Sequence, residues 1–267
     1  METVGILREA AARVYENVKD MAGTADAAGS FGRGAGGDIS RRIDIVAEDT
    51  VLDCFRERGL ACTVLGEECG QVELSENPKG FVIMDAIDGS ANAVRGIPFF
   101  CCSLAYAEDN RISSITHAVV ANLANGDQYW ASKDKGAYLD EERIKVHDSD
   151  PIYRITGINT SRLKPDVVDG LRPVFGPPNH TRHFGANALE MAMVAEGKMD
   201  ILIDLRGMIR VLDLAAGYLI VREAGGLVLD ENLQPLDSEL GYANRLSFYA
   251  TSTKKTLNDI LAQMNEK

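Results

Sequence analysis

The chain is short of positive charge. Its 28 Lys and Arg residues are outnumbered by 40 Asp and Glu residues, which gives a formal net charge of −12. Nucleic acids and anionic membranes attract basic surfaces, so this balance argues against both as partners. It also means that an anionic substrate needs a metal ion and local arginines to be held.

Cysteines and long apolar runs are also scarce. No Cys and His cluster has the spacing of a zinc site, and no apolar run approaches membrane-spanning length. The N-terminus has no basic segment followed by an apolar one. The odd cysteine count and the apolar surroundings indicate reduced core residues rather than a disulfide framework: Cys54, Cys62, Cys69, Cys101 and Cys102. We therefore expect a cytoplasmic protein.

The overall composition is that of a globular protein, with one internal change. The 267 residues are 45% hydrophobic and 25% charged, which allows one large domain or two medium ones. Polar residues and a proline at 147–151 mark a boundary. We predict an N-terminal α+β domain at 1–150 and a C-terminal α/β domain at 151–267.

The most informative stretch is residues 81–92. Its apolar start predicts a buried strand that ends where Asp85 and Asp88 begin. Two buried carboxylates repel one another unless a cation lies between them, and oxygen ligands suit Mg²⁺ or Mn²⁺. Gly89 permits a sharp turn, Ser90 adds a hydroxyl, and the amides that follow can cradle a phosphate. The alternative interpretation is an Asp-rich surface turn.

Two other segments also place acids at the ends of apolar runs. The expected strand at 62–65 leads into Gly66, Glu67 and Glu68, and the apolar helical segment at 211–221 carries Asp213 near its start. An acid in such a helical segment is either a capping residue or a ligand. Taken alone, the glutamate pair is also typical of a surface turn.

The region before these motifs is rich in glycine and acids. Residues 29–37 hold too many glycines to predict a stable element, and the lack of a preceding strand and a following Gly-Lys-Ser/Thr argues against a nucleotide-phosphate loop. Because Asp38 follows at once, we interpret the stretch as a mobile loop near a site. Asp44 and Glu48 share one face of a second predicted helix, and Asp44 is alternatively its N-cap.

Hydrophobic periodicity predicts the remaining elements. They are an opening helix at 7–21, an antiparallel meander at 99–139 with a hairpin turn at 125–126, strands at 153–158, 199–203 and 247–251, a helix at 188–195 and a last helix from 254.

Three motifs, in this order, together resemble a known signature set. Residues 66–68, 85–90 and 212–217 are similar to those of the inositol monophosphatase and fructose-1,6-bisphosphatase superfamily, the lithium-sensitive, Mg²⁺-dependent sugar phosphatases. The resemblance implies a layered α-β-α-β-α sugar-phosphatase fold, part α+β and part α/β, with the active site between the halves. It also implies a homodimer.

Departures from the inositol monophosphatase pattern indicate which group within the superfamily this chain resembles. Those enzymes usually have proline, threonine and tryptophan where this chain has Ala86, Ser90 and Leu212. Several other features resemble the fructose bisphosphatases or, for the last segment, the archaeal type that hydrolyses both substrates: Ser90 with Asn92, Gly37 with Asp38, Asp44, residues 49–51 and residues 206–210.

The resemblance also implies roles for individual residues. Two or three Mg²⁺ ions, or Mn²⁺ as an alternative, would be held by Glu67, Asp85, the backbone carbonyl of Ile87, Asp88 and Asp213, with Asp38 on a mobile loop that helps to close the site. The catalytic residues acting on the attacking water would be Asp44, Glu67 and Ser90, and the phosphate would contact Asp88, Gly89 and Ser90. The sugar or a second phosphate would contact Arg182, Arg206 and, with weaker support, Arg210; the alternative for each arginine is a surface ion pair.

The predicted function is therefore a Mg²⁺-dependent phosphatase for fructose 1,6-bisphosphate and inositol 1-phosphate. One alternative is a phosphatase acting on 3′-phosphoadenosine 5′-phosphate or NADP, although no clear pair of aromatic residues for adenine stands out. Another is an inactive metal-binding regulatory protein. The number of metal ions and the preferred substrate stay open at this point.

Overall fold

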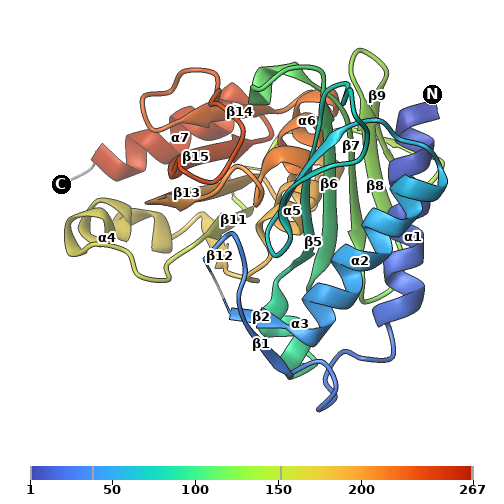
Figure 1. Cartoon of the computed structure of the whole chain (residues 1–267). Coiled ribbons are helices and arrows are strands. Elements are labelled where there is room, and N and C mark those ends of the chain that lie inside the picture. Colours follow the sequence, from blue (N-terminus) through green and yellow to red (C-terminus); the bar gives the residue numbers. More distant parts are fainter. Residues whose placement is uncertain (1, 38, 151, 266–267) are drawn as a thin grey trace.

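The computed structural model describes residues 2–37, 39–150 and 152–265, and its helices and sheets form five layers (Figure 1). Helices α1 and α2 cover one face of an eight-stranded sheet, α5 and α6 lie between it and a five-stranded sheet, and α4 and α7 form the outer layer. This is the predicted α-β-α-β-α arrangement. The helix bounds are α1 Glu2–Val18, α2 Arg42–Glu57, α3 Ser90–Arg95, α4 Pro165–Leu171, α5 Asn187–Glu196, α6 Ala215–Glu223 and α7 Lys254–Asn265.

The eight-stranded sheet has the order β10-β9-β8-β7-β6-β5-β3-β4. Its strands are antiparallel except for the β3–β5 pair, which is parallel. Because helices cover both faces, the central strands are buried on both sides and read as continuous apolar runs. The bounds are β3 Thr63–Gly66, β4 Gly70–Glu73, β5 Phe81–Asp88, β6 Cys101–Ala107, β7 Ile115–Asn122, β8 Gln128–Ser132, β9 Gly136–Leu139 and β10 Glu142–Ile144.

The five-stranded sheet has the order β12-β11-β13-β15-β14. Strand β11 is parallel to both of its neighbours, whereas β15 is antiparallel to β13 and β14. The bounds are β11 Arg154–Ile158, β12 Asn179–Arg182, β13 Ile201–Ile209, β14 Leu227–Asp230 and β15 Leu246–Thr251. All strands of this sheet follow residue 150, but no independent observation tests the predicted division into two domains, which stays a prediction.

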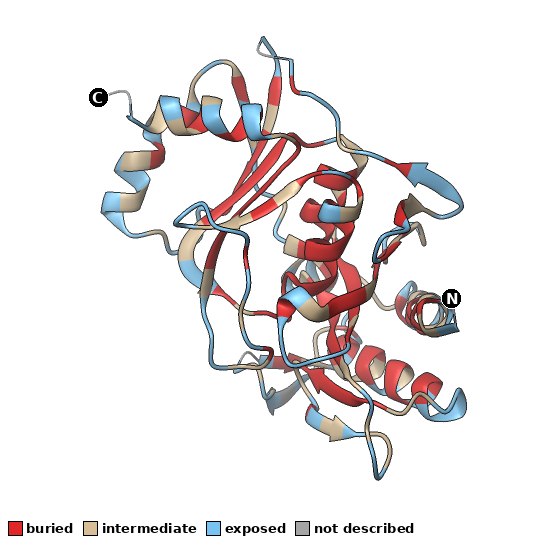
Figure 2. Cartoon of the chain, turned by 90° about the horizontal axis from the view of Figure 1, so that it is seen from above, coloured by how far each residue is buried: buried red, intermediate tan, exposed pale blue. Residues whose placement is uncertain are grey.

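The middle helix layer is largely buried (Figure 2). Every residue of α6 from Ala215 to Val221 is buried, because the helix contacts both sheets and α5. At Gly217 a Cβ atom would lie 2.6 Å from the Cβ of Met191 in α5. A side chain at Gly217 would therefore push these two helices apart, which explains the small residues of this apolar segment.

Two sequence predictions about elements are wrong. Strand β5 does not end before the acids but runs through Asp88, with a register shift between Asp85 and Asp88. The glycine-rich stretch is not without structure, because β1 (Ser30–Arg33) pairs with β2 (Ile39–Arg41) in an antiparallel hairpin. Gly32 and Gly37 adopt positive φ angles, so glycine here permits the hairpin rather than preventing it.

The cysteines and the hydrophobic segments largely follow the sequence analysis. All five cysteines are free, and four are buried, while Cys69 is exposed. Among the residues that the structure describes, no helix is both long enough and apolar enough to cross a membrane.

Candidate metal centre

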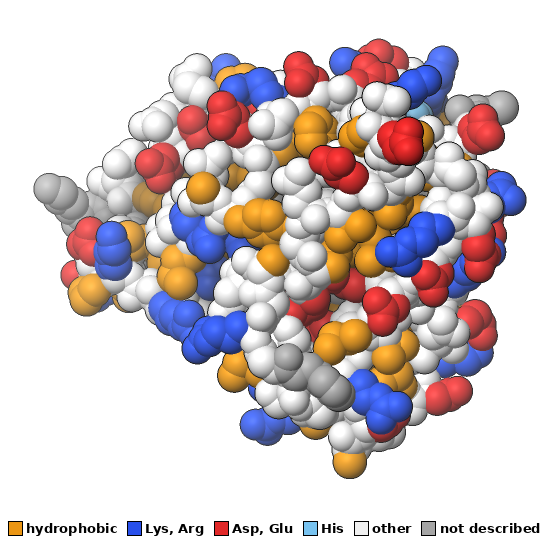
Figure 3. Space-filling view, viewed as in Figure 1, with side chains coloured by type: hydrophobic (Ala, Val, Ile, Leu, Met, Phe, Trp, Pro, Cys, Tyr) orange, Lys and Arg blue, Asp and Glu red, His pale blue; other side chains and the backbone are white. Residues whose placement is uncertain are grey.

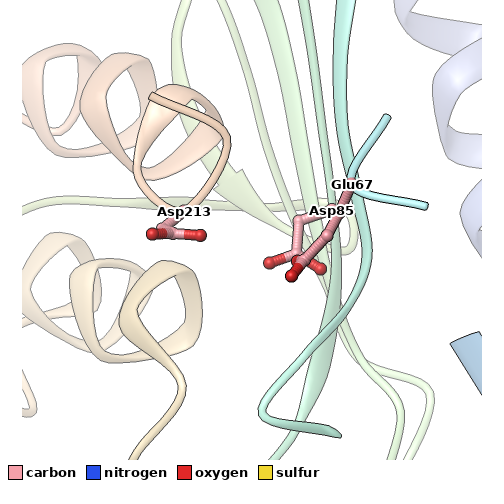
Figure 4. Close-up of side chains that lie close together, drawn as sticks. All are labelled: Glu67, Asp85 and Asp213. Atoms are coloured by element: carbon pink, nitrogen blue, oxygen red, sulfur yellow. The ribbon is translucent and has the colours of Figure 1, made fainter. Parts of the chain in front are cut away.

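Three acidic side chains meet between the ends of β3 and β5 and the start of α6 (Figure 4). Oxygen atoms of Glu67, Asp85 and Asp213 lie within 4.8 Å of one another. Asp85 and Asp213 are buried, and the Glu67 side chain is 14% exposed. Figure 4 shows Asp213 on one side, facing the other two acids. The structure thus brings together acids from all three sequence motifs.

Strand pairing explains why two of these acids are neighbours. Strands β3 and β5 are parallel, with Gly66 opposite Met84. The residues that follow this pair, Glu67 just after β3 and Asp85 still within β5, are therefore neighbours at the same edge of the sheet. The third acid comes from the other side of the site, where Asp213 stands just before the first turn of α6.

The acids are crowded enough to perturb one another. Burial raises the pKa of Asp85 well above its usual value, and the nearby charges of Glu67, Asp88 and Asp213 raise it further. The Arg210 guanidinium acts in the opposite direction. A cation among these carboxylates relieves their repulsion, and an all-oxygen donor set suits a hard divalent ion.

Arg210 lies within this cluster rather than facing a substrate position alone. Its Nη1 atom is 2.7 Å from Glu67 Oε1, and its Nη2 atom is 2.7 Å from Asp213 Oδ1. Its Nε atom donates to both Asp213 oxygens, at 3.0 and 3.3 Å. The guanidinium therefore bridges two of the three acids, a role that the sequence analysis did not assign to it.

Asp88 is buried beside the cluster and lines the same cleft. Its Oδ2 atom accepts a hydrogen bond of 2.7 Å from the backbone amide of Ala188, in the first turn of α5. Burial first, and then the charge of Asp213, raises the pKa of Asp88 to about 8. Asp88 thus connects the end of β5 to the middle helix layer while remaining next to the other acids.

A second group of acids surrounds a small cavity of about 10 Å³, close to the minimum for one water molecule. Burial raises the pKa of Asp44, which lines this cavity, to about 6. Asp44 is not the N-cap of α2, since its Oδ2 atom accepts a 2.7 Å hydrogen bond from the backbone amide of Arg41, three residues earlier. Its buried Oδ1 atom has no hydrogen-bond partner among the described residues. The cavity lining is Asp44, Glu48, Glu67, Glu68, Asp85, Ala86, Ile87 and Ser90.

Glu48 has a structural role that the sequence analysis missed. Its two carboxylate oxygens accept hydrogen bonds from the backbone amides of Glu68, at 2.9 Å, and Cys69, at 2.7 Å. These bonds hold the turn that presents Glu67. The (i, i+4) spacing from Asp44 correctly placed Glu48 on the same helix face, but its partners depend on tertiary contacts.

The turn after β5 has the predicted geometry. Gly89 adopts a φ angle of +91°, and a Cβ atom there would approach the Ala186 Cβ to 3.1 Å. Helix α3 begins at Ser90, whose hydroxyl donates a 2.9 Å hydrogen bond to the Ile87 carbonyl. Ser90 lines the small cavity together with Asp44.

A cleft of about 1150 Å³ opens over the acids. Figure 3 shows acidic side chains within a hollow near the centre of this face, with basic side chains to one side of it. The residues lining the cleft include the predicted Asp44, Glu67, Asp85, Ile87, Asp88, Gly89, Ser90, Arg206, Arg210 and Asp213. Arg182 is not among them; its Nη1 atom donates to the Thr181 carbonyl at 2.8 Å.

The arginines of the cleft differ in how they are paired. Arg206 is held by Asp204, which is fully buried, through contacts as short as 2.6 Å. Four others that the sequence analysis missed also line the cleft, and in the described parts of the chain none of them has a carboxylate partner: Arg41, Arg95, Arg162 and Arg245. Unpaired arginines in an acidic protein mark this rim as a place for an anion.

The β1–β2 hairpin lies directly against the acid cluster. The backbone amide of Gly36 donates a 2.7 Å hydrogen bond to the Glu67 carbonyl. A Cβ atom at Gly36 would lie only 2.5 Å from Arg210 Nη1 and 2.9 Å from Glu67 Cγ. The predicted metal ligand Asp38 lies outside the described residues, but the segment just before it does lie at the site.

A five-layer fold with an acidic cluster in a cleft between its layers defines the class of layered α-β-α-β-α phosphatases. The chain belongs to the inositol monophosphatase family, whose profile matches residues 2–266. This confirms the resemblance inferred from the three acidic motifs and makes the protein a phosphoric monoester hydrolase of a metal-dependent family.

Several known proteins are similar to most of this chain. The fructose-1,6-bisphosphatase/inositol-1-monophosphatase of Methanothermobacter thermautotrophicus is 34% identical, covering 92% of this chain and 90% of that protein. The crystal structure described as an inositol monophosphatase–fructose 1,6-bisphosphatase superposes with a TM-score of 0.85 at 30% identity, covering 97% of this chain and 98% of that one. A bifunctional NADP phosphatase/NAD kinase of Methanococcus maripaludis is 30% identical, covering 80% of this chain and 41% of that protein.

Proposed function

We propose that this protein hydrolyses phosphate monoesters of small sugars and polyols, with fructose 1,6-bisphosphate and inositol 1-phosphate as substrates and Mg²⁺ as the metal. The observation that carries the proposal is the cleft itself. It combines three carboxylates within 4.8 Å of one another with arginines that have no carboxylate partner among the described residues. The relatives named for both activities support the substrate pair.

The donor set fits magnesium, with manganese as the alternative. Carboxylate oxygens come from Glu67, Asp85 and Asp213, and the neighbouring Asp88 and the Ile87 carbonyl add oxygen donors. Hard oxygen ligands of this kind are those that Mg²⁺ and Mn²⁺ prefer. Bound ions would supply charge stabilisation to the phosphoryl oxygens and the leaving alkoxide.

Asp44 and Ser90 would act on the attacking water. Both residues line the small cavity, and the buried Asp44 Oδ1 atom has no hydrogen-bond partner among the described residues. A pKa of about 6 leaves Asp44 ionised at neutral pH and still basic enough to take a proton. Asp44 would hold that proton on Oδ1, while Glu67 helps to orient the water from the same cavity.

The scissile phosphate would lie over the turn that follows β5. The first amides of a helix have no carbonyl partner within the helix, so those after Gly89 can donate to phosphate oxygens. Asp88 is next to this turn and lines the same cleft. Gly89 is needed because its positive φ angle turns the chain between Asp88 and the helix.

A second phosphate would bind at the arginine rim. Arg162 and Arg245 are exposed, line the cleft and have no carboxylate partner in the part of the chain that the structure describes. Arg206 also lines it, although Asp204 already neutralises its charge. Arg182 is a weaker candidate than its sequence position predicts, because it does not line the cleft. We therefore assign the second phosphate to Arg162 and Arg245, with Arg206 beside them.

Phosphate release from a panel of substrates tests the proposal. The full chain is assayed with fructose 1,6-bisphosphate, inositol 1-phosphate, NADP and 3′-phosphoadenosine 5′-phosphate, in Mg²⁺ and after chelation. We expect release from the first two that needs Mg²⁺. Preference for NADP would favour the activity named for the Methanococcus maripaludis relative, and no release from any substrate would favour a regulatory protein. The homodimer stays a prediction, which light scattering in solution checks.

A further inference from the structure

We propose that Arg210 is a built-in counter-ion, which holds Glu67 and Asp213 in place and is displaced from them when a divalent ion binds. The inference rests on the metal site proposed above. It assigns to Arg210 control over metal affinity and over the stability of the metal-free protein, rather than contact with the sugar.

The guanidinium uses the same oxygen atoms that an ion would need. Nη2 and Nε lie 2.7 and 3.0 Å from Asp213 Oδ1, and the Arg210 backbone amide donates to Oδ2 at 2.9 Å. Nη1 lies 2.7 Å from Glu67 Oε1. An ion bound by these acids would stand next to a positive charge within a poorly solvated cluster, where like charges repel strongly. Ion and guanidinium therefore compete for Glu67 and Asp213.

Burial makes this competition effective. The side chains of Arg210, Glu67 and Asp213 are only 11%, 14% and 12% exposed. Screening by solvent is therefore weak, and paired charges with several hydrogen bonds are strong in such places. Exposed ion pairs would contribute little by comparison.

The displaced Arg210 side chain has space in the open cleft. Arg210 lines the open cleft as well as contacting the acids. On its other side the Gly36 carbonyl accepts a long contact of 3.5 Å from Nη1. Rotation toward the cleft breaks the bonds to Glu67 and Asp213 and the long contact with the hairpin.

Calorimetric titration with Mn²⁺ alone, on chelator-stripped full-length protein, tests the proposal without any substrate. We expect Arg210→Gln to bind Mn²⁺ at least tenfold more tightly than the unchanged protein, which corresponds to about 1.4 kcal/mol. The matched control is Arg245→Gln, which removes a cleft arginine that has no carboxylate partner in the described residues. It should change the affinity less than twofold, and so it measures the effect of losing positive charge in general.

Thermal unfolding gives a second and independent readout. Without metal, Arg210→Gln should unfold at a lower temperature than the unchanged protein, because its acids have lost their counter-ion. Saturating Mn²⁺ should raise its melting temperature by more than it raises that of the unchanged protein, since tighter binding stabilises more. Equal or weaker Mn²⁺ binding by Arg210→Gln would overturn the proposal.

A second variant keeps the test decisive if Arg210→Gln does not fold. Arg210→Lys retains the charge on a single ammonium nitrogen, which cannot reproduce the two-nitrogen contact that Nε and Nη2 make with Asp213. It should bind Mn²⁺ more tightly than the unchanged protein and less tightly than the glutamine variant; binding equal to the unchanged protein would contradict the proposal. Failure of the unchanged protein to bind Mn²⁺ at all is a separate result, which would remove the metal site itself.

Discussion

Asp88 is a buried acid whose surroundings disfavour its ionised form, and its pKa is therefore raised to about 8. Asp88→Asn keeps the side-chain volume and an oxygen that can accept from the Ala188 amide. We expect it to lose most phosphatase activity in saturating Mg²⁺, because the proposed metal ligand has been neutralised. The melting temperature of the metal-free protein should stay level or rise, because repulsion within the acid cluster is relieved.

The control for this variant is Asp166→Asn, which neutralises an exposed acid in the first turn of α4. It should leave both phosphate release and the melting temperature nearly unchanged. Near-normal turnover of Asp88→Asn would sink the assignment of Asp88 to the metal site.

Glu190 provides a pH-dependent prediction away from the acid cluster. It is 1% exposed, and burial raises its pKa to about 7 although the amides of Phe184 and Gly185 donate to it. A raised carboxyl pKa means that folding favours the neutral form. The stability it contributes is complete below about pH 4.5 and is lost as pH rises through about 7, by about 3 kcal/mol in total.

The effect of Glu190→Gln on the melting temperature should therefore change sign with pH. At about pH 5 the glutamate is already neutral, and glutamine loses one acceptor, which costs about 1 kcal/mol or a few degrees in melting temperature. At about pH 8.5 the variant should melt above the unchanged protein, because no charge is buried. Melting curves at both pH values check this, and a difference that is independent of pH would contradict it.

At the level of single residues, the sequence identified which residues form the site better than it identified what those residues contact. The acids at 67, 85, 88 and 213 were found because each follows or precedes an apolar run. The bridging role of Arg210 was not found, nor was the lack of a carboxylate partner for Arg162 and Arg245 in the described part of the chain, since nothing in their local sequence indicates which charges lie opposite. Partners of long side chains are set by tertiary contacts.

The hairpin of β1 and β2 allows a prediction about an element. Gly36→Ala places a Cβ atom against Arg210 and Glu67, so the hairpin must shift by a fraction of an ångström or displace them. We expect kcat/KM to fall by roughly tenfold to a hundredfold, because small misplacements of catalytic groups are costly. The melting temperature should change little, since the hairpin contributes few core residues.

The control is Gly32→Ala in the same hairpin. Unlike Gly36, Gly32 has a positive φ angle, +98°, but a Cβ atom there meets nothing within 4 Å. It strains the hairpin without touching the site, so its loss of kcat/KM should be clearly smaller. Equal losses in both variants would mean that hairpin strain, and not the contact with Glu67, explains the effect.

Hydrogen exchange over residues 29–37 with and without Mg²⁺ and phosphate would also show whether the hairpin closes on the ligand, as a loop near the site should.

Elements with strong patterns were predictable, and weakly patterned ones were not. Helix α1, helix α2 and the strands of the meander follow their hydrophobic periodicity closely. Helix α4 was missed, although Pro165 at its first helical position was an available signal. Strand β4 was missed because it is a short edge strand with only one fully buried residue, so its sequence carries little pattern.

The prediction about substrates concerns the whole molecule, because residues from separate parts of the fold form the cleft. Arg162→Ala and Arg245→Ala should each lower kcat/KM for fructose 1,6-bisphosphate by about tenfold to a hundredfold, the effect of losing about 1.5–3 kcal/mol of charged hydrogen bonding. Inositol 1-phosphate lacks the second phosphate and should be affected much less. Parallel kinetics on both substrates provide the measurement.

Arg182→Ala is the matched control, since Arg182 does not line the cleft. This variant should not appreciably change kcat/KM for either substrate. Arg206→Ala is unsuitable for this comparison, because it leaves the fully buried Asp204 without its counter-charge, a change that costs about 3–5 kcal/mol of stability. Equal losses on both substrates in the Arg162 and Arg245 variants would mean that these arginines act on the common phosphate or on the fold.

The third acid reaches the site from a late part of the chain. A polypeptide synthesised from its N-terminus completes the strands that carry Glu67 and Asp85 long before Asp213 leaves the ribosome. The segment that then supplies Asp213 also carries Arg210, three residues earlier. The last acid thus arrives together with its own positive charge, and closing the site adds no net negative charge to it. We therefore expect the newly made chain to finish folding without waiting for magnesium.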